Sequence, residues 1–94
     1  MTNEELLVKV KTGLFGSPSG EWRDGMLQVY INEVKEFMLD AGVKQSVLES
    51  EKAVGCIMIG VNDLWNYSGG GVKFSPYFKE RVVQLASGNR GDKS

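Results

Sequence analysis

The sequence contains no histidine and only one cysteine, Cys56. A single cysteine cannot form an intramolecular disulfide, and the usual zinc sites of cysteine and histidine cannot be assembled. Cys56 also lacks the imidazole that commonly activates a nucleophilic thiol. Because it lies within the apolar stretch "VGCIMIG", we expect a small buried hydrophobic side chain. Both scarcities are typical of a protein in a reducing, cytoplasmic setting.

Positive charge is not in excess either, since 11 Lys and Arg residues are balanced by 12 Asp and Glu, for a formal net charge of −1. Tight nonspecific binding to nucleic acid draws most of its free energy from neutralised phosphates, so this balance argues against it. No apolar run reaches the ~20 residues that a membrane-spanning helix needs, and we expect no membrane partner. The composition, 41% hydrophobic and 24% charged, is instead typical of a globular domain.

Hydrophobic periodicity predicts an all-α domain. Thr2 and Glu5 have the spacing of a capping box, so a short helix should begin there and end near Gly13. The longest amphipathic pattern, "EWRDGMLQVYINEVKEFMLDAG", covers residues 21–42. It predicts a helix of about five turns that ends at Gly42 in a positive-φ conformation.

The stretch "EKAVGCIMIGVNDLWNYS", residues 51–68, is apolar at its centre, and such a run could also be a buried strand. We favour a helix because the apolar positions continue at helical spacing through Trp65 and no partner strand is evident. Ser50 should cap this helix. A helix that is apolar nearly all round should be the central one, and Gly55 and Gly60 should let neighbouring backbones approach it closely.

The last predicted helix starts at Ser75, a good N-cap, followed by Pro76 at the first helical position, and runs to Ala86. Three consecutive glycines precede it, and we expect them to form a hinge. The hinge residues are Gly69, Gly70 and Gly71. The sequence thus predicts one domain, residues 1–87, with a small bundle of three main helices plus a short N-terminal helix. A flexible, disordered C-terminal tail should follow over residues 88–94.

The chemistry-bearing residues give little sign of a reaction. In "GGGVKFS" the lysine, Lys73, stands two residues after the last glycine, whereas a phosphate-binding loop needs Gly-Lys-Ser/Thr between a strand and a helix. Glu33, Glu36 and Asp40 could be imagined as a metal site, but no histidine joins them and a solvated helix face is expected. Asp63 could cap a helix or bind a partner, although a surface carboxylate is the default. We expect no enzyme activity, cofactor or metal.

Aromatic side chains crowd both sides of the glycine link, and a domain this small can hardly bury all of them. Some should be left for a partner, because aromatic anchors dominate interface energetics. The predicted assembly interface comprises Trp65, Tyr67, Phe74, Tyr77, Phe78, Lys79, Arg81 and Val82. In this interpretation the last helix docks in a groove on another subunit. The alternative is that it folds back onto its own central helix.

The stretch "SEKAVGCIMIGVNDLWNYSGGGVKFSPYFKERVVQLAS", preceded by "YINEVKEFMLDAGV", resembles the small head–tail connector (DNA-packaging, portal adaptor) proteins of tailed bacteriophages and prophages. The resemblance covers roughly residues 3–87. It consists of an amphipathic helix that ends in "DAGV", an apolar helix that ends in "NDLWNY", a glycine-rich link and the helix "SPYFKERVVQL".

This resemblance implies an all-α structural protein of the virion that assembles into a ring, of about twelve subunits, on the portal protein. Such a ring extends the DNA channel and gives the tail completion (stopper) protein a platform. It implies no catalytic residues, and a location at the head–tail interface, or in the host bacterial cytoplasm during assembly. DNA would pass through without sequence-specific binding, and the charge balance agrees because strong phosphate contacts would brake its transit.

A small helical DNA-binding regulator of helix-turn-helix type is the alternative from a different class. It would need a recognition helix rich in Arg, Lys, Asn or Gln. Lys79, Arg81 and Gln84 are the one candidate group, and the acidic overall balance argues against this function. Binding to duplex DNA at physiological salt would discriminate between the two.

Overall fold

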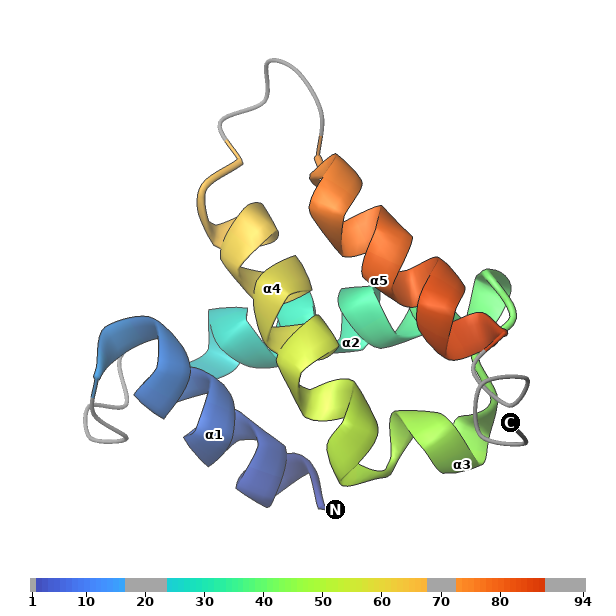
Figure 1. Cartoon of the computed structure of the whole chain (residues 1–94). Coiled ribbons are helices and arrows are strands. Elements are labelled where there is room, and N and C mark those ends of the chain that lie inside the picture. The colour runs from blue at the N-terminus through green and yellow to red at the C-terminus, as the bar shows by residue number, and fades with distance from the viewer. Residues whose placement is uncertain (1, 17–23, 68–72, 88–94) are drawn as a thin grey trace.

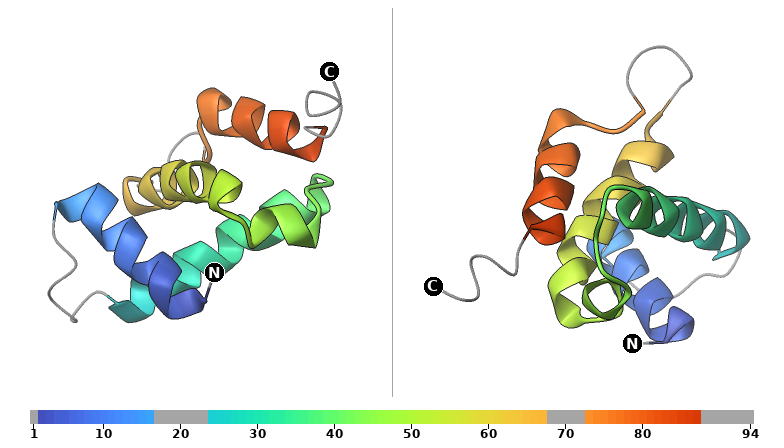
Figure 2. Two further views of the ribbon diagram at one scale, coloured as in Figure 1. Left: turned by 60° about the horizontal axis from the view of Figure 1, so that its bottom comes forward. Right: turned by 90° about the vertical axis from the view of Figure 1, so that its right-hand side faces the viewer.

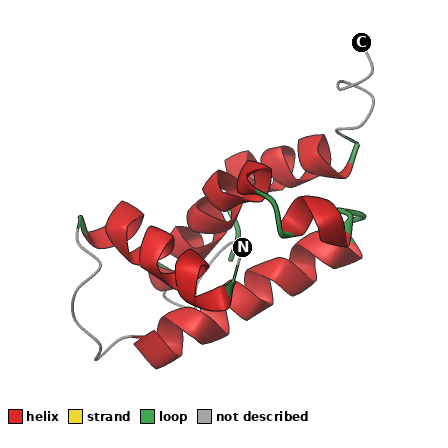
Figure 3. Ribbon diagram, turned by 90° about the horizontal axis from the view of Figure 1, so that it is seen from below, coloured by secondary structure: helices red, strands yellow, loops and turns green. Residues whose placement is uncertain are grey.

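The structure, a computed structural model, describes residues 2–16, 24–67 and 73–87. Within these ranges the chain forms helices and short connections, without a strand (Figures 1 and 3). The elements are α1 Asn3–Phe15, α2 Asp24–Asp40, α3 Gln45–Leu48, the 3-10 turn η1 Glu51–Ala53, α4 Val54–Trp65 and α5 Pro76–Ala86. The predicted all-α class is confirmed, and the apolar stretch is a helix. The predicted hinge, residues 69–71, and the predicted tail, residues 88–94, lie outside the described residues.

The first helix begins as predicted but is longer than expected. The backbone N–H of Glu5 donates to the Thr2 hydroxyl at 3.1 Å, and Glu5 accepts from the Thr2 N–H at 2.9 Å, which completes the capping box. The predicted end at Gly13 is wrong. The helix continues to Phe15, and Gly16 ends it with a φ of 76° and an N–H that donates to the Thr12 carbonyl.

The end of α2 and the start of α5 follow the predicted local signals. Gly42 ends α2 with a φ of 104°, and the N–H of the buried Val43 donates to the Met38 carbonyl at 3.0 Å. Ser50 caps the 3-10 turn η1 rather than α4, whose own N-cap, Ala53, makes no side-chain capping hydrogen bond. Ser75 caps α5 through a hydrogen bond from the Phe78 N–H, with proline in the first turn.

Helix α4 is the central element of the molecule. It packs against α1, α2 and α5, and the side view places it between α5 and α2 (Figure 2). The side chains of α2 and α4 buried in the core include Ile31, Val34, Ile57, Val61 and Leu64. Phe37, Val54 and Met58 are only half-buried. Helix α4 therefore packs on α2, and its central place agrees with the prediction from its apolar composition.

Two glycines mark where helices approach α4 closely, and only one was predicted. A Cβ on Gly60 would lie 2.7 Å from Phe78 Cε1 and 2.9 Å from Val34 Cγ2, so this position must stay small. The prediction for Gly55 is wrong, because a Cβ there would meet no atom within 4 Å. The second close approach is at Gly13, where a Cβ would collide with the Met58 sulfur. This contact explains a glycine in the middle of α1.

An ion pair between a buried lysine and a partly exposed aspartate joins α1 to the start of α2. Lys11 is only 5% exposed, and its Nζ lies 2.8 Å from the Asp24 carboxylate. A charge buried this deeply requires a partner, since an uncompensated one costs several kcal/mol. The pair therefore fixes the end of α1 against the first turn of α2.

Candidate functional site

Nucleophilic and metal-binding groups are sparse in the described parts of the chain. No group of three or more Cys, Asp or Glu side chains that could hold a metal ion comes together there. Cys56 is fully buried, as predicted. Burial raises the pKa of its thiol to about 11, against a smaller opposing effect of the positive charge on Arg81. The thiol is therefore protonated at neutral pH and is a poor nucleophile.

Of the three α2 carboxylates considered as a metal site, Glu36 and Asp40 are exposed, as expected for a solvated helix face, and Glu33 is half-buried. Glu33 forms an ion pair with Lys73, whose ammonium pKa is raised by that hydrogen bond. Glu36 and Asp40 line a shallow groove beside Phe37. Lys73 thus ties the residues that lead into α5 to α2.

Three residues of the predicted assembly interface lie inside the chain's own core. Phe74, Phe78 and Val82 are 6%, 0% and 1% exposed. The rings of Phe74 and Phe78 pack at a tilt with centroids 4.7 Å apart, and the ring centroid of Phe37 on α2 lies 4.9 Å and 5.6 Å from theirs. In this conformation the last helix folds back onto its own central helix, the alternative above, and these side chains are not available to a partner.

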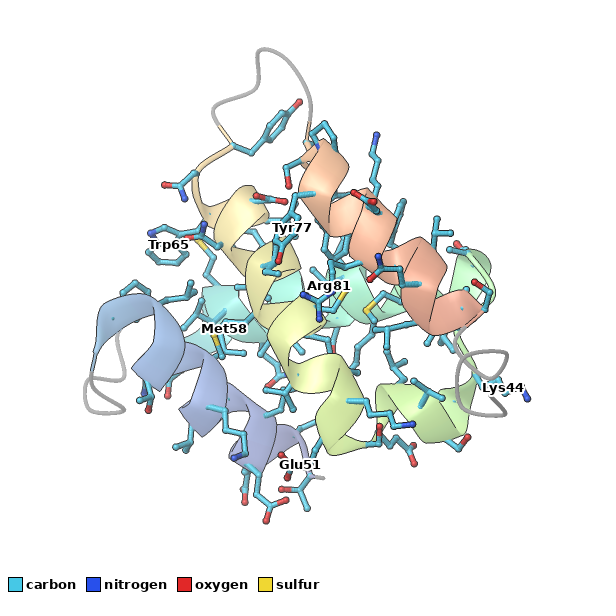
Figure 4. All side chains as sticks on the ribbon, viewed as in Figure 1. Lys44, Glu51, Met58, Trp65, Tyr77 and Arg81 are labelled. Atoms are coloured by element: carbon cyan, nitrogen blue, oxygen red, sulfur yellow. The ribbon has the colours of Figure 1, made fainter. Side chains whose placement is uncertain are left out.

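Trp65 also serves intramolecular packing, although it is half-buried. Its ring makes edge-on contacts with Phe15 of α1 at 5.4 Å and with Tyr30 of α2 at 6.1 Å. The tryptophan at the end of α4 therefore joins three helices at one corner of the molecule (Figure 4). A partner could reach only the exposed part of its indole.

The start of α5 is fixed to α4 by Asp63. One carboxylate oxygen of Asp63 accepts from the Ser75 backbone N–H at 3.0 Å and from the Ser75 hydroxyl at 2.9 Å. The same hydroxyl accepts from the Phe78 N–H and caps α5. Asp63 therefore supports the cap of the next helix rather than standing as a free surface carboxylate.

The remaining predicted interface residues are on the surface but do not form one patch. Tyr67 and Tyr77 are 39% and 57% exposed. Arg81 donates to the Tyr77 hydroxyl at 3.2 Å, and both side chains lie over α4 in the view of Figure 4. Lys79 projects from the other edge of α5, toward the groove at Phe37. The two cations of this helix therefore point in different directions.

A furrow between α1 and α4 is a surface feature that the sequence did not reveal. It encloses about 450 Å³ and is mainly apolar. We name the α1–α4 furrow by its lining residues Val8, Lys9, Thr12, Gly13, Val54 and Met58. Val8 is 49% exposed. An adjoining pocket of about 650 Å³ is lined by three carboxylates, Glu5, Glu49 and Glu51, and by one cation, Lys9.

The outer side of α2 carries a second apolar feature, and it includes Met26, which helical periodicity places on the apolar face but which the structure exposes. Its buried side chains face the core, and the opposite side forms what we name the α2 ridge, made of Met26, Val29, Glu36 and Asp40. Met26 and Val29 are 55% and 60% exposed. Val29 among polar neighbours is the one sequence signal that could have found this ridge.

Comparison with known proteins finds no family model, no curated protein and no solved structure that matches the chain. Among the described residues, no helix is both long and apolar enough to cross a membrane. Function must therefore be argued from the sequence stretches quoted above and from the surfaces of the fold.

Proposed function

We propose that this chain is a head–tail connector of a tailed bacteriophage or prophage, a structural protein without catalytic activity. It assembles as a ring on the portal protein, extends the DNA channel and joins the head to the tail. One observation carries the proposal: the stretches that resemble connector proteins coincide with elements of the fold. "DAGV" closes α2, "NDLWNY" closes α4, and "SPYFKERVVQL" is the cap and body of α5.

The dimensions of the molecule support a ring around DNA. Its principal extents are 43 × 32 × 20 Å. About twelve such blocks, set side by side along their shortest dimension, have a mean circumference of roughly 240 Å and leave an opening of roughly 30–45 Å. A DNA duplex about 20 Å wide passes through such an opening. The formal net charge of −1 suits passage without retention, because few phosphates would be neutralised.

The regulator alternative finds no comparable support. A recognition helix needs several base-contacting side chains on one face. On α5, Lys79 and Arg81 project from different edges, so the helix lacks a continuous basic face. Weak, salt-sensitive association with DNA is the most that this arrangement favours.

The test is binding to the portal protein encoded in the same genome. We expect the purified portal ring to retain this chain as a stacked ring, visible by electron cryomicroscopy of the complex. An isolated portal subunit that cannot form a ring serves as the control. A portal ring that stays bare at tens of micromolar of this chain would reject the proposed function, and submicromolar affinity for duplex DNA at physiological salt would favour the regulator.

A further inference from the structure

We propose that the α2 ridge of one copy docks across the α1–α4 furrow of the next copy, in a head-to-tail contact. This names the subunit contact of the proposed ring and so rests on the proposed function. The occupant is a second copy of this chain.

The two surfaces lie on different faces of the molecule. The buried side of α2, including Ile31 and Val34, faces the core and α4, so the α2 ridge points away from α4. The furrow is on the face where α1 flanks α4, and α2 lies behind α4 in that view (Figures 1 and 2). Two different patches on different faces produce a heterologous contact, which closes into a ring or extends as a filament.

Both surfaces expose apolar side chains, which project from the ridge and line the furrow. Met26 and Val29, one helical turn apart, form a convex pair with more than half of each residue exposed. The furrow offers Val8, Val54 and the flexible Met58 thioether, a side chain that adapts to irregular partners. Docking a helix into such a groove buries apolar area that is in water in the single chain.

Charge sets the direction in which α2 crosses the furrow. Glu36 and Asp40 lie seven and eleven residues beyond Val29, or about 10 and 16 Å along the helix. Packed helices are about 8–10 Å apart. When the α2 helix of one copy starts in the furrow and crosses α4 of the next copy, the stretch of about 10–16 Å that separates Val29 from Glu36 and Asp40 therefore reaches α5 of that copy. Arg81 lies there, held over α4 by the Tyr77 hydroxyl (Figure 4). The reverse direction would bring both carboxylates toward the adjoining pocket, where Glu5, Glu49 and Glu51 outnumber Lys9.

The test compares three substitutions in the full chain by sedimentation velocity from micromolar to millimolar concentration. Val8→Asp damages the furrow and Val29→Asp damages the ridge. Val83→Asp is the matched control, because Val83 is 62% exposed on α5 and belongs to neither surface. We expect the wild type and Val83→Asp to associate beyond dimers. The two interface variants should each associate at least tenfold more weakly.

Mixing the two damaged variants distinguishes a head-to-tail contact from a two-fold symmetric one. Each keeps one intact surface, so an equimolar mixture should form a dimer and nothing larger. A mixture that stays monomeric overturns the proposal, as does a Val29→Asp variant that associates like the wild type. Charge reversal adds a check on direction: Arg81→Glu should weaken association roughly tenfold, and Glu36→Arg with Asp40→Arg in the same chain should restore it.

Cross-linking covers the case of a contact too weak to sediment. A Val8→Cys/Val29→Cys variant should oxidise into a covalent ladder, while Val29→Cys/Val83→Cys should not; the buried native thiol stays unreactive. A monomeric wild type without a ladder rejects the contact. Ladder formation without portal binding would keep this inference and remove the proposed function. A complete ring of Val29→Asp subunits on the portal would reject this inference and keep the proposed function.

Discussion

Gly55 and Gly60 stand five residues apart in the same helix, and we predict that the same substitution has opposite effects at the two positions. Gly60→Ala places a methyl group 2.7 Å from the edge of the Phe78 ring and 2.9 Å from Val34. Both neighbours are fully buried and have little room to move. Gly55→Ala places its methyl group in open space.

The magnitudes follow from two competing effects. Alanine is more favourable than glycine inside a helix by up to about 1 kcal/mol, so Gly55→Ala should raise the free energy of unfolding by that amount. Crowding in a packed core costs about 1–3 kcal/mol, which at Gly60 outweighs the gain in helix propensity. The two variants should differ by about 2 kcal/mol, or roughly 8–16 °C in Tm for a domain of this size.

Thermal melts followed by circular dichroism, with urea titrations for the free energies, measure this difference. A third variant tests the cause. Phe78→Leu removes the ring edge that the new methyl group meets, so Gly60→Ala should cost less in that background by at least about 0.5 kcal/mol. Equal shifts in Tm for Gly55→Ala and Gly60→Ala, or full additivity with Phe78→Leu, would refute the described packing of α5 and α2 on α4.

Three further outcomes are expected. Asp63→Ala should lower the free energy of unfolding by about 1–2 kcal/mol, since it leaves two Ser75 donors without their acceptor. Hydrogen exchange at the Phe78 amide should then accelerate, and an unchanged exchange rate would contradict the role of Asp63 in supporting the cap of α5. Cys56 should resist a thiol reagent at pH 8 and react on unfolding, because its pKa is raised to about 11; rapid labelling of the native protein would argue against burial. The pKa of Glu5 is lowered below 4.5 mainly by the hydrogen bond from the Thr2 backbone. The ionised Glu5 carboxylate therefore stabilises the fold above pH 4.5, and this stabilisation is lost as the pH falls through the lowered pKa. Thermal melts at a series of pH values on both sides of that pKa should show a smaller pH dependence of Tm for Glu5→Gln.

The features predictable from the sequence are those that neighbouring residues decide. The capping box at Thr2 and the Ser-Pro start of α5 depend on hydrogen bonds within one turn, and both appear where they were expected. The predicted end of α1 overlooked a local signal, because Pro18 follows Gly16 by two residues and a proline there is typical of a helix end. The close contact at Gly13 was not predictable, because Met58, whose side chain fills the space beside that glycine, lies 45 residues later in the chain.

The candidate surfaces show the same limit. Apolar spacing on α5 marks Phe78 and Val82 as side chains that need covering, but it does not say whether the cover comes from the same copy or another. The structure supplies it from Phe37 and Gly60 of the same chain. The furrow and the Lys11–Asp24 pair arise from segments that meet only in three dimensions, so no local pattern announces them.

The contact between Phe78 and Gly60 also determines when the protein can fold during synthesis. Helix α4 emerges from the ribosome with its surface at Gly60 still open, because the Phe78 ring that packs against it is made later, on α5. A chain released after Tyr67 would lack this ring and leave Gly60 and the neighbouring Phe37 without its cover. We therefore expect such a fragment to be unfolded and prone to aggregation. The nascent chain gains its native stability only after α5 has left the exit tunnel.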